Sequence, residues 1–171
     1  MDKISIIFIL FFLFVVSNGF SQTSYSFKIE TGFLNSRYHY VDIDPGPNWQ
    51  GYYLNGENGI DLNIINGINY KDKFLVGLGL GYLNFEGING ISVFSDFEYL
   101  PIKTRIGPLI YMKAGYSHLW NQYENGTGDG LVEIGAGLNF RLSSDIHIYI
   151  KSGFMMTQQS TIIPFRLGFK L

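Results

Sequence analysis

Three histidines, His39, His118 and His147, are the residues best suited to acid–base chemistry in this 171-residue chain, which has no cysteine. Ser117 precedes His118, and a serine and a histidine act as nucleophile and base when their side chains meet. Neighbouring side chains on an extended strand point to opposite faces, so Ser117 and His118 cannot form this pair between themselves. We interpret His147 as a polar side chain that fills an interior.

Asp42 and Asp44 lie near His39 in a stretch rich in Pro, Gly and Asn, so a contact between His39 and Asp42 stays open. The Asp-x-Asp spacing is not followed by the further oxygen ligands of a calcium loop. Without cysteine there are no disulfides, thiolate metal sites or cysteine nucleophiles. We therefore predict no catalytic, metal or cofactor site and no enzymatic activity, with a lipid-modifying activity as the enzyme alternative.

A second set of polar residues is charged, and its members alternate with apolar residues along the chain. They are Lys28, Glu30, Asp61, Asp96, Glu98, Lys113, Glu133, Arg141, Lys151, Arg166 and Lys170. Six are basic and five are acidic, which is close to balance. Because an isolated buried charge is costly, this balance suits a closed interior in which opposite charges pair. We predict that these residues form ion pairs inside a barrel.

The elements that must position these residues are strands. After Gln22 the chain lacks the i, i+3, i+4, i+7 apolar spacing of a helix and alternates with period two instead. Eight stretches alternate in this way: 24–33, 60–70, 74–82, 91–99, 110–117, 132–142, 146–154 and 165–171. A tilted strand needs about 9–11 residues to cross a bilayer. We predict an all-β fold, an eight-stranded antiparallel up-and-down transmembrane β-barrel over residues 22–171.

The stretch GLGLGY at 77–82 shows what the two faces of such strands contain, because its glycines alternate with Leu78, Leu80 and Tyr82. A soluble barrel or sandwich with a polar outer face is the alternative. Glycine weakens a solvated strand, whereas inside a narrow barrel it leaves room for long side chains of neighbouring strands. Charged residues make up only 15% of the chain, against about 25% in soluble domains. We predict apolar side chains facing lipid, and glycines and charges facing the lumen.

The connections between these strands differ in length. Short connections are expected at 70–73, 101–107 and 143–145, and longer ones at 34–59, 84–90, 119–130 and 155–161. Outer-membrane barrels have short periplasmic turns and longer extracellular loops. We therefore expect the longer connections outside the cell and both ends of the barrel in the periplasm.

The N-terminal segment differs from the rest. Ile4 to Val16 is an apolar run broken only by Ser5, and small residues at Gly19 and Ser21 follow it. A spanning helix needs about 20 apolar residues, whereas the core of a signal peptide needs about 7–15. We predict a signal peptide at residues 1–21, cleaved before Gln22, with a short membrane anchor as the alternative.

The first long connection is rich in aromatic residues. Together with one residue of the third long connection, the candidate recognition residues are Tyr38, Tyr40, Trp49, Tyr52, Tyr53 and Trp120. Exposed Trp and Tyr often anchor binding partners. Two interpretations stand: a surface that binds a glycan, a lipid head group or a protein, and aromatics that belong to the membrane interface or cap the barrel.

The eight alternating stretches, the N-terminal segment and the closing PFRLGFKL resemble the small eight-stranded outer-membrane β-barrel proteins of Gram-negative bacteria, the OmpA/OmpX-type group. INGINYKDKFLVGLGLGY, MKAGYSHLW and GAGLNFRL are similar to the outer-membrane protein β-barrel domain proteins. The resemblance implies a location in the outer membrane and insertion by the barrel assembly machinery, and it implies no activity. Outer-membrane lipid and lipopolysaccharide are the partners expected from it.

Two functions of different classes follow. The first is a non-enzymatic barrel with a structural or surface-interaction role through its extracellular loops. The second is a small pore or transporter for small or hydrophobic solutes, which a charge-paired interior disfavours. A formal net charge of −2 gives no indication of nucleic acid as a partner.

Overall fold

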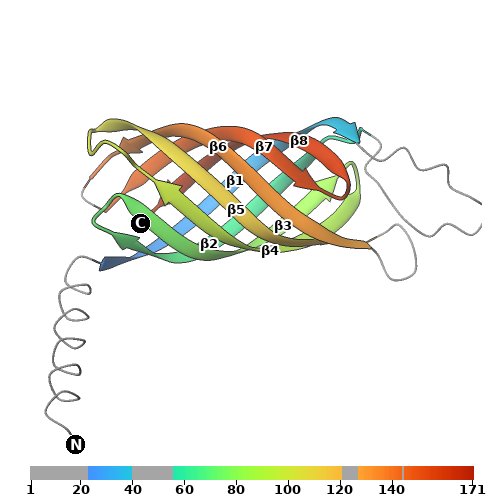
Figure 1. Cartoon of the computed structure of the whole chain (residues 1–171), viewed down its shortest axis with the longest axis horizontal. Helices are drawn as coiled ribbons and strands as arrows, with labels where there is room; N and C mark the ends of the chain where they lie inside the picture. Colours follow the sequence, from blue (N-terminus) through green and yellow to red (C-terminus); the bar gives the residue numbers. More distant parts are fainter. Residues whose placement is uncertain (1–22, 40–55, 121–126, 144) are drawn as a thin grey trace, which may run out of the picture.

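The computed structural model describes residues 23–39, 56–120, 127–143 and 145–171. These residues form eight strands: β1 (Thr23–His39), β2 (Gly59–Tyr70), β3 (Phe74–Phe85), β4 (Ile88–Tyr99), β5 (Ile106–Leu119), β6 (Thr127–Arg141), β7 (His147–Thr157) and β8 (Ser160–Lys170). Each strand pairs antiparallel with the next, and β8 pairs with β1, so the sheet closes into a barrel (Figure 1). The predicted eight-stranded antiparallel barrel is confirmed. The predicted signal peptide, residues 1–21, lies outside the described residues.

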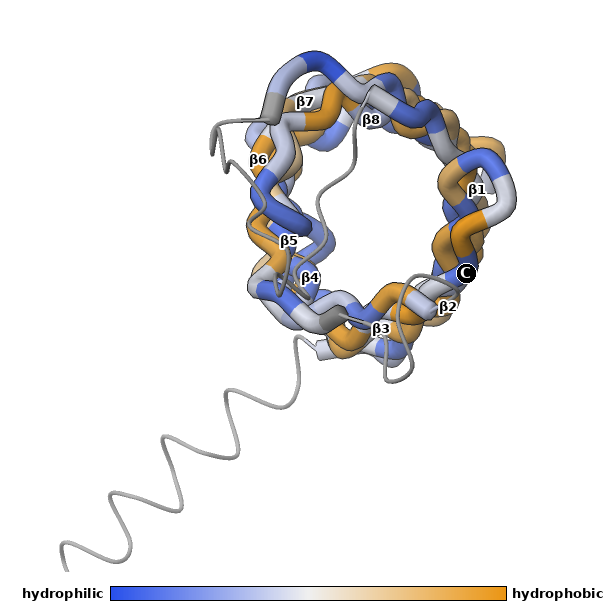
Figure 2. Tube along the Cα trace, turned by 90° about the vertical axis from the view of Figure 1, so that its right-hand side faces the viewer, coloured by the Kyte–Doolittle hydropathy of each residue, from blue (hydrophilic) through white to orange (hydrophobic). Residues whose placement is uncertain are grey.

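The alternation of side chains explains why the chain forms these strands. In β3 the glycines at 77, 79 and 81 face the interior, whereas Leu78 and Leu80 are 69% and 64% exposed. Figure 2 shows hydrophilic and hydrophobic residues interleaved around the wall of the barrel. None of the described residues belongs to a helix long and apolar enough to span a membrane.

The two ends of the barrel differ in the chain termini and connections that they carry. We call the end where β1 starts and β8 finishes the terminal end, and the opposite end, where the long connection 40–58 leaves β1, the loop end (Figure 1). The turns β2–β3, β4–β5 and β6–β7 lie at the terminal end. The turns β3–β4 and β7–β8 lie at the loop end, where β1 ends and β2 begins.

The expected lengths of two connections were wrong. Glu86 and Gly87 alone join β3 to β4, and Gln158 and Gln159 alone join β7 to β8. All four residues have positive φ, between 50° and 100°, as in the two-residue turns whose twist matches that of paired strands. The strands therefore run further toward the loop end than predicted, with lengths of 11 to 17 residues.

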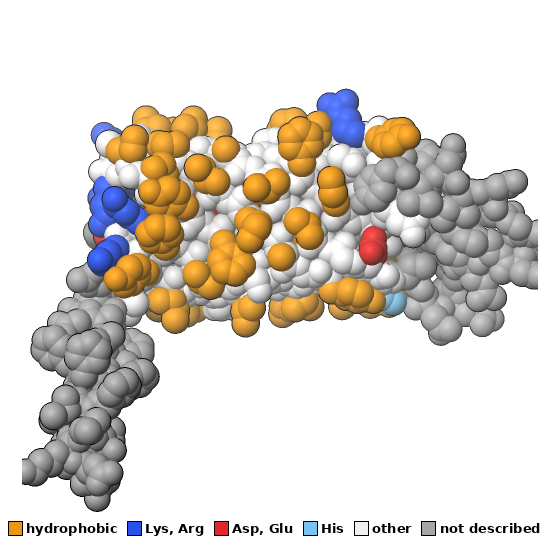
Figure 3. Space-filling view, in the orientation of Figure 1, with side chains coloured by type: hydrophobic (Ala, Val, Ile, Leu, Met, Phe, Trp, Pro, Cys, Tyr) orange, Lys and Arg blue, Asp and Glu red, His pale blue; other side chains and the backbone are white. Residues whose placement is uncertain are grey.

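The exterior of the barrel is apolar along the strands. Outward side chains such as Ile60, Val93, Ile134 and Phe165 are each more than half exposed. Figure 3 shows hydrophobic side chains spread over the visible wall, with Lys and Arg at the terminal end and, in one place, nearer the loop end. This surface has the reverse polarity of a soluble protein.

The interior is packed in layers. Near the loop end, six inward apolar residues form a cluster: Leu34, Leu83, Phe85, Leu119, Met155 and Ile162. Charged residues occupy the middle. Toward the terminal end Leu100, Leu109 and Tyr149 form a second apolar cluster. The lumen is thus closed by side chains at several depths.

Candidate functional site: a buried ionic network

The middle of the lumen contains a chain of ion pairs between strands far apart in sequence. Lys28 of β1 reaches β4, where its Nζ lies 2.5 Å from Asp96 Oδ2 and also contacts Glu98. Lys151 of β7 contacts the same Glu98 at 3.4 Å and Glu30 of β1 at 2.7 Å. Glu98 therefore lies between two cations from different strands.

Arg166 of β8 forms the other half of the network. Its guanidinium contacts Glu133 of β6 and, through Nε at 2.9 Å, Asp61 of β2. The same Nε lies 3.7 Å from Glu30 Oε1, which also accepts from Lys113. Glu30 thereby joins the two halves into one network of four basic and five acidic side chains, all less than 5% exposed.

Neutral side chains complete the contacts of these charges. Tyr149 Oη donates to Glu30 Oε2 at 3.0 Å, and Asn63 Nδ2 donates to Asp61 Oδ2 at 2.9 Å. The ammonium of Lys151 lies 4.4 Å from the ring centroid of Tyr111. Such hydrogen bonds and cation–π contacts offset part of the desolvation that buried charges suffer.

Glycine provides the space that these long side chains occupy. A β-carbon on Gly32 would lie 2.6 Å from Asp61 Oδ1 and 2.7 Å from Arg166 Cγ. Any larger residue at 32 would therefore displace the Asp61–Arg166 pair. The absence of a side chain in β1 at this depth is a requirement of the network.

Nine of the eleven predicted interior charges belong to this network, and two do not. Arg141 and Lys170 line a polar cavity of about 240 Å³ at the terminal end, together with His147, Asp72 and Asp145. Among the described residues, neither Arg141 nor Lys170 forms an ion pair. His147 Nδ1 and Asn139 Nδ2 are 2.9 Å apart there, so His147 is a polar residue of the mouth.

The predicted serine and histidine are kept apart by the wall of the barrel. Ser117 is buried, and its Oγ is 2.6 Å from Thr157 Oγ1 and accepts from Gln158 Nε2 at 3.0 Å. His118 packs edge-on against Trp120, with ring centroids 5.4 Å apart. The two side chains lie on opposite faces, so the described residues form no nucleophile–base pair from Ser117 and His118.

Within the described ranges, no three His, Asp or Glu side chains are grouped so that they could hold a metal ion. Asp42, Asp44 and the side chain of His39 lie outside what the structure describes. The open contact between His39 and Asp42 therefore stays a prediction.

The candidate recognition residues are divided between two sides of the barrel. Tyr38 is in β1 and is 67% exposed, whereas Trp120 follows β5 and is 40% exposed. Three strands lie between β1 and β5 in either direction around the barrel, so Tyr38 and Trp120 do not meet. Tyr40, Trp49, Tyr52 and Tyr53 lie outside the described residues.

Sequence reasoning missed the apolar part of the lumen. Leu34, Leu119 and Met155 fell in expected loops, yet each continues the inward alternation of its strand. Extending the period-two pattern by one or two residues would have found them. Two members of this cluster, Leu83 and Met155, lie beside Asp61, Lys113 and Arg166, so the apolar and ionic layers are contiguous.

Solved structures provide the comparison for this architecture, since no protein-family model and no curated protein matches the sequence. Neisserial surface protein A (NspA) is similar with a TM-score of 0.64 at 6% identity, over 87% of this chain and 97% of that one. The N-terminal β-barrel domain of Pseudomonas aeruginosa OprF is similar with a TM-score of 0.50 at 16% identity, over 88% and 100%. The chain therefore has the fold of the small eight-stranded outer-membrane barrels.

Proposed function

We propose that this protein is a non-enzymatic outer-membrane β-barrel of a Gram-negative bacterium, with a closed interior and a structural or surface-interaction role. The observation that carries the proposal is the reversed polarity of the barrel. Apolar side chains cover the outside, while nine charged side chains pair inside. No aqueous location suits a protein with this distribution.

The exterior supports a bilayer as the surrounding medium. Soluble monomers rarely expose contiguous apolar patches larger than a few hundred Å², whereas here the outward residues of all eight strands are mainly apolar. Closure of the sheet satisfies the backbone hydrogen bonds of every strand, as hydrocarbon requires. Both features favour residence in lipid.

The interior supports a structural role over transport. The ionic network crosses the lumen between opposite strands, and an apolar cluster closes it on each side. An ion entering this space would have to displace paired charges in a region of low dielectric constant. A pore is therefore disfavoured.

The loop end supports contact with the exterior of the cell. Both ends of the barrel sequence lie at the terminal end, which outer-membrane barrels place in the periplasm. In this orientation the connection 40–58, with its aromatic residues, faces outward toward lipopolysaccharide and any glycan or protein partner. We expect the barrel assembly machinery to insert the chain from the periplasm, where the terminal end stays.

Electrophoretic mobility and conductance test this proposal together. The folded barrel in detergent should migrate differently with and without boiling, because a closed sheet resists unfolding by detergent. In planar bilayers the same preparation should give no single-channel current. Absence of a heat-dependent band would contradict the barrel in lipid, and steady unitary conductance would favour the pore instead.

A further inference from the structure

Three lysines gather on adjacent turns at the terminal end. Lys71 and Lys73 belong to the β2–β3 turn, and Lys103 belongs to the β4–β5 turn. Lys103 Nζ lies 3.2 Å from Asp72 Oδ2, and the Leu100 amide donates to the Lys73 carbonyl at 2.7 Å. These two contacts hold the turns side by side. With Asp72 counted, this lysine cluster has a net charge of +2.

Most of this charge is available to a partner. The Lys103–Asp72 pair is 41% and 72% exposed, so it contributes little energy and opens readily. Among the described residues Lys71 and Lys73 form no ion pair; the ammonium of Lys71 lies over the ring of Tyr70, 5.1 Å from its centroid. The lysine cluster thus lacks sufficient acidic partners within the described part of the chain.

Aromatic residues separate the lysine cluster from the apolar wall. Phe74 and Tyr99 are directly opposed on β3 and β4, and their rings stack with centroids 4.8 Å apart. Tyr70 adjoins them at the end of β2. Aromatic side chains at this position mark the level of lipid head groups in membrane proteins.

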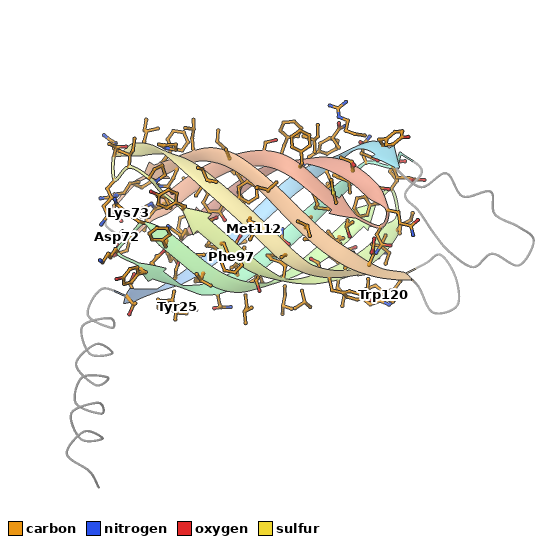
Figure 4. The ribbon with its side chains drawn as sticks, in the orientation of Figure 1. Tyr25, Asp72, Lys73, Phe97, Met112 and Trp120 are labelled. Carbon is orange, nitrogen blue, oxygen red and sulfur yellow. The ribbon has the colours of Figure 1, made fainter. Side chains whose placement is uncertain are left out.

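A depression of about 220 Å³ opens in the apolar wall next to these aromatics. Its outward lining comes from four adjacent strands and consists of Phe74, Val76, Phe97, Tyr99, Ile110, Met112 and Ile134. Val76, Phe97, Met112 and Ile134 are consecutive partners across the sheet. Figure 4 shows Lys73 and Asp72 at the terminal end, and Phe97 and Met112 farther along the same side of the barrel.

We propose that this face of the barrel binds an anionic glycerophospholipid. Its phosphate lies among Lys71, Lys73 and Lys103, and one of its acyl chains lies in the depression. The inference rests on the proposed membrane location. It adds that the barrel selects lipid by charge in the leaflet at its terminal end.

The two parts of the site point to a lipid and not to a soluble anion. A soluble phosphate would use the lysine cluster alone and leave the depression empty. An uncharged lipid would use the depression alone and leave the cluster without a counter-ion. A molecule that carries both a phosphate and a hydrocarbon chain occupies both parts, and the head-group level of a bilayer supplies such molecules.

Native mass spectrometry of the full chain in detergent tests the site, with dioleoyl phosphatidylglycerol and dioleoyl phosphatidylcholine as probes. The protein should bind phosphatidylglycerol at least about tenfold more tightly, since each lysine near an anionic lipid contributes roughly fivefold. A K71Q/K73Q/K103Q variant should lose this preference. A K71R/K73R/K103R variant, which retains the charges, should keep it.

The depression is tested separately by filling it. Met112→Trp should weaken phosphatidylglycerol binding about tenfold. Ile150→Trp is the matched control, because Ile150 lines a different depression of about 460 Å³ on β6, β7 and β8. Equal binding by the wild type and the K71Q/K73Q/K103Q variant would overturn the proposal. Competition by free glycerol phosphate at the same concentration as lipid would overturn it too, because that would indicate a soluble-anion site.

The failure of this inference can be told apart from failure of the proposed function. A chain that shows the heat-dependent band and no current, but no preference for phosphatidylglycerol, retains the proposed function and lacks the lipid site. Absence of the heat-dependent band would contradict both the proposed function and the lipid site.

Discussion

Glu30 is the residue on which the interior depends most. It accepts from Lys113, from Lys151 at 2.7 Å and from Tyr149 at 3.0 Å, and it lies 3.7 Å from Arg166. No other carboxylate of the network contacts three cations. Its charge is therefore the one whose removal leaves the most buried cations without compensation.

Glu30→Gln should lower the free energy of unfolding by about 3–5 kcal/mol, the usual cost of breaking a buried pair from one side. Equilibrium unfolding in urea, with the protein in lipid vesicles, measures this change. Glu86→Gln is the matched control: it removes the same charge from an exposed turn, where a change below about 0.5 kcal/mol is expected. Equal unfolding midpoints for the two variants would show that the network does not stabilise the barrel.

At the residue scale the sequence predicted which charges face inward but not which of them meet. Alternation assigns Lys28 and Glu98 to the lumen, yet their contact depends on the tilt and stagger of β1 and β4, which no local pattern encodes. Arg141 illustrates the limit, because it has the correct parity but sits too near the terminal end to reach a carboxylate of the network.

At the scale of elements, the β2–β3 pair leaves no room for a side chain at the level where both strands carry glycine. Gly67 and Gly77 are directly opposed across the pair. A β-carbon on Gly67 would lie 2.6 Å from the Val76 carbonyl oxygen and 2.9 Å from Gly77 Cα. Both neighbours are backbone atoms, so neither can rotate away.

Gly67→Ala should therefore destabilise the barrel by about 1–3 kcal/mol, the range for overpacking. Gly130→Ala in β6 is the control, because a β-carbon there meets nothing within 4 Å; there the loss of unfolded-state entropy should leave stability unchanged or raise it by up to about 1 kcal/mol. Urea unfolding of both variants in the same vesicles gives the comparison. A Gly67→Ala variant as stable as the Gly130→Ala variant would mean that the strands separate without cost.

The hairpins were harder to predict than the strands. Glu86-Gly87 contains the glycine that two-residue turns favour. The residues on either side of it do not alternate clearly, so a longer loop was predicted. Gln158-Gln159 has no turn signal at all. Its conformation is held by tertiary contacts, since the Gln159 amide donates to Asp129 at 3.1 Å and Gln158 donates to Ser117. Such contacts between distant segments are invisible to local patterns.

At the scale of the whole molecule, the two ends carry different charges. The turns of the terminal end contain Lys71, Lys73, Lys103 and Arg105 with Asp72 and Asp145, whereas the described residues of the loop end contain Glu57, Glu86 and Asp129 with Arg37. The period-two pattern was sufficient to predict the closed barrel and its polarity. The position of each end relative to the membrane follows only by analogy with other barrels.

The orientation can be measured directly, because the chain has no cysteine. Trp49→Cys should react with a membrane-impermeant maleimide on intact cells. Ser143→Cys, in the β6–β7 turn at the terminal end, should react only after the outer membrane is permeabilised. Labelling of Ser143→Cys on intact cells, with Trp49→Cys protected, would reverse the proposed orientation.

Because Arg166 lies in the last strand, its ion pairs form only when the barrel is complete. Until β8 is in place, three carboxylates, Glu30, Asp61 and Glu133, face a common space without the guanidinium that they share. In a seven-stranded intermediate these carboxylates would therefore repel one another, and the lumen would stay open to water. Release of a finished barrel from its insertion machinery would then coincide with neutralisation of these carboxylates. A product that lacks β8 would differ from the finished barrel in the net charge of its lumen.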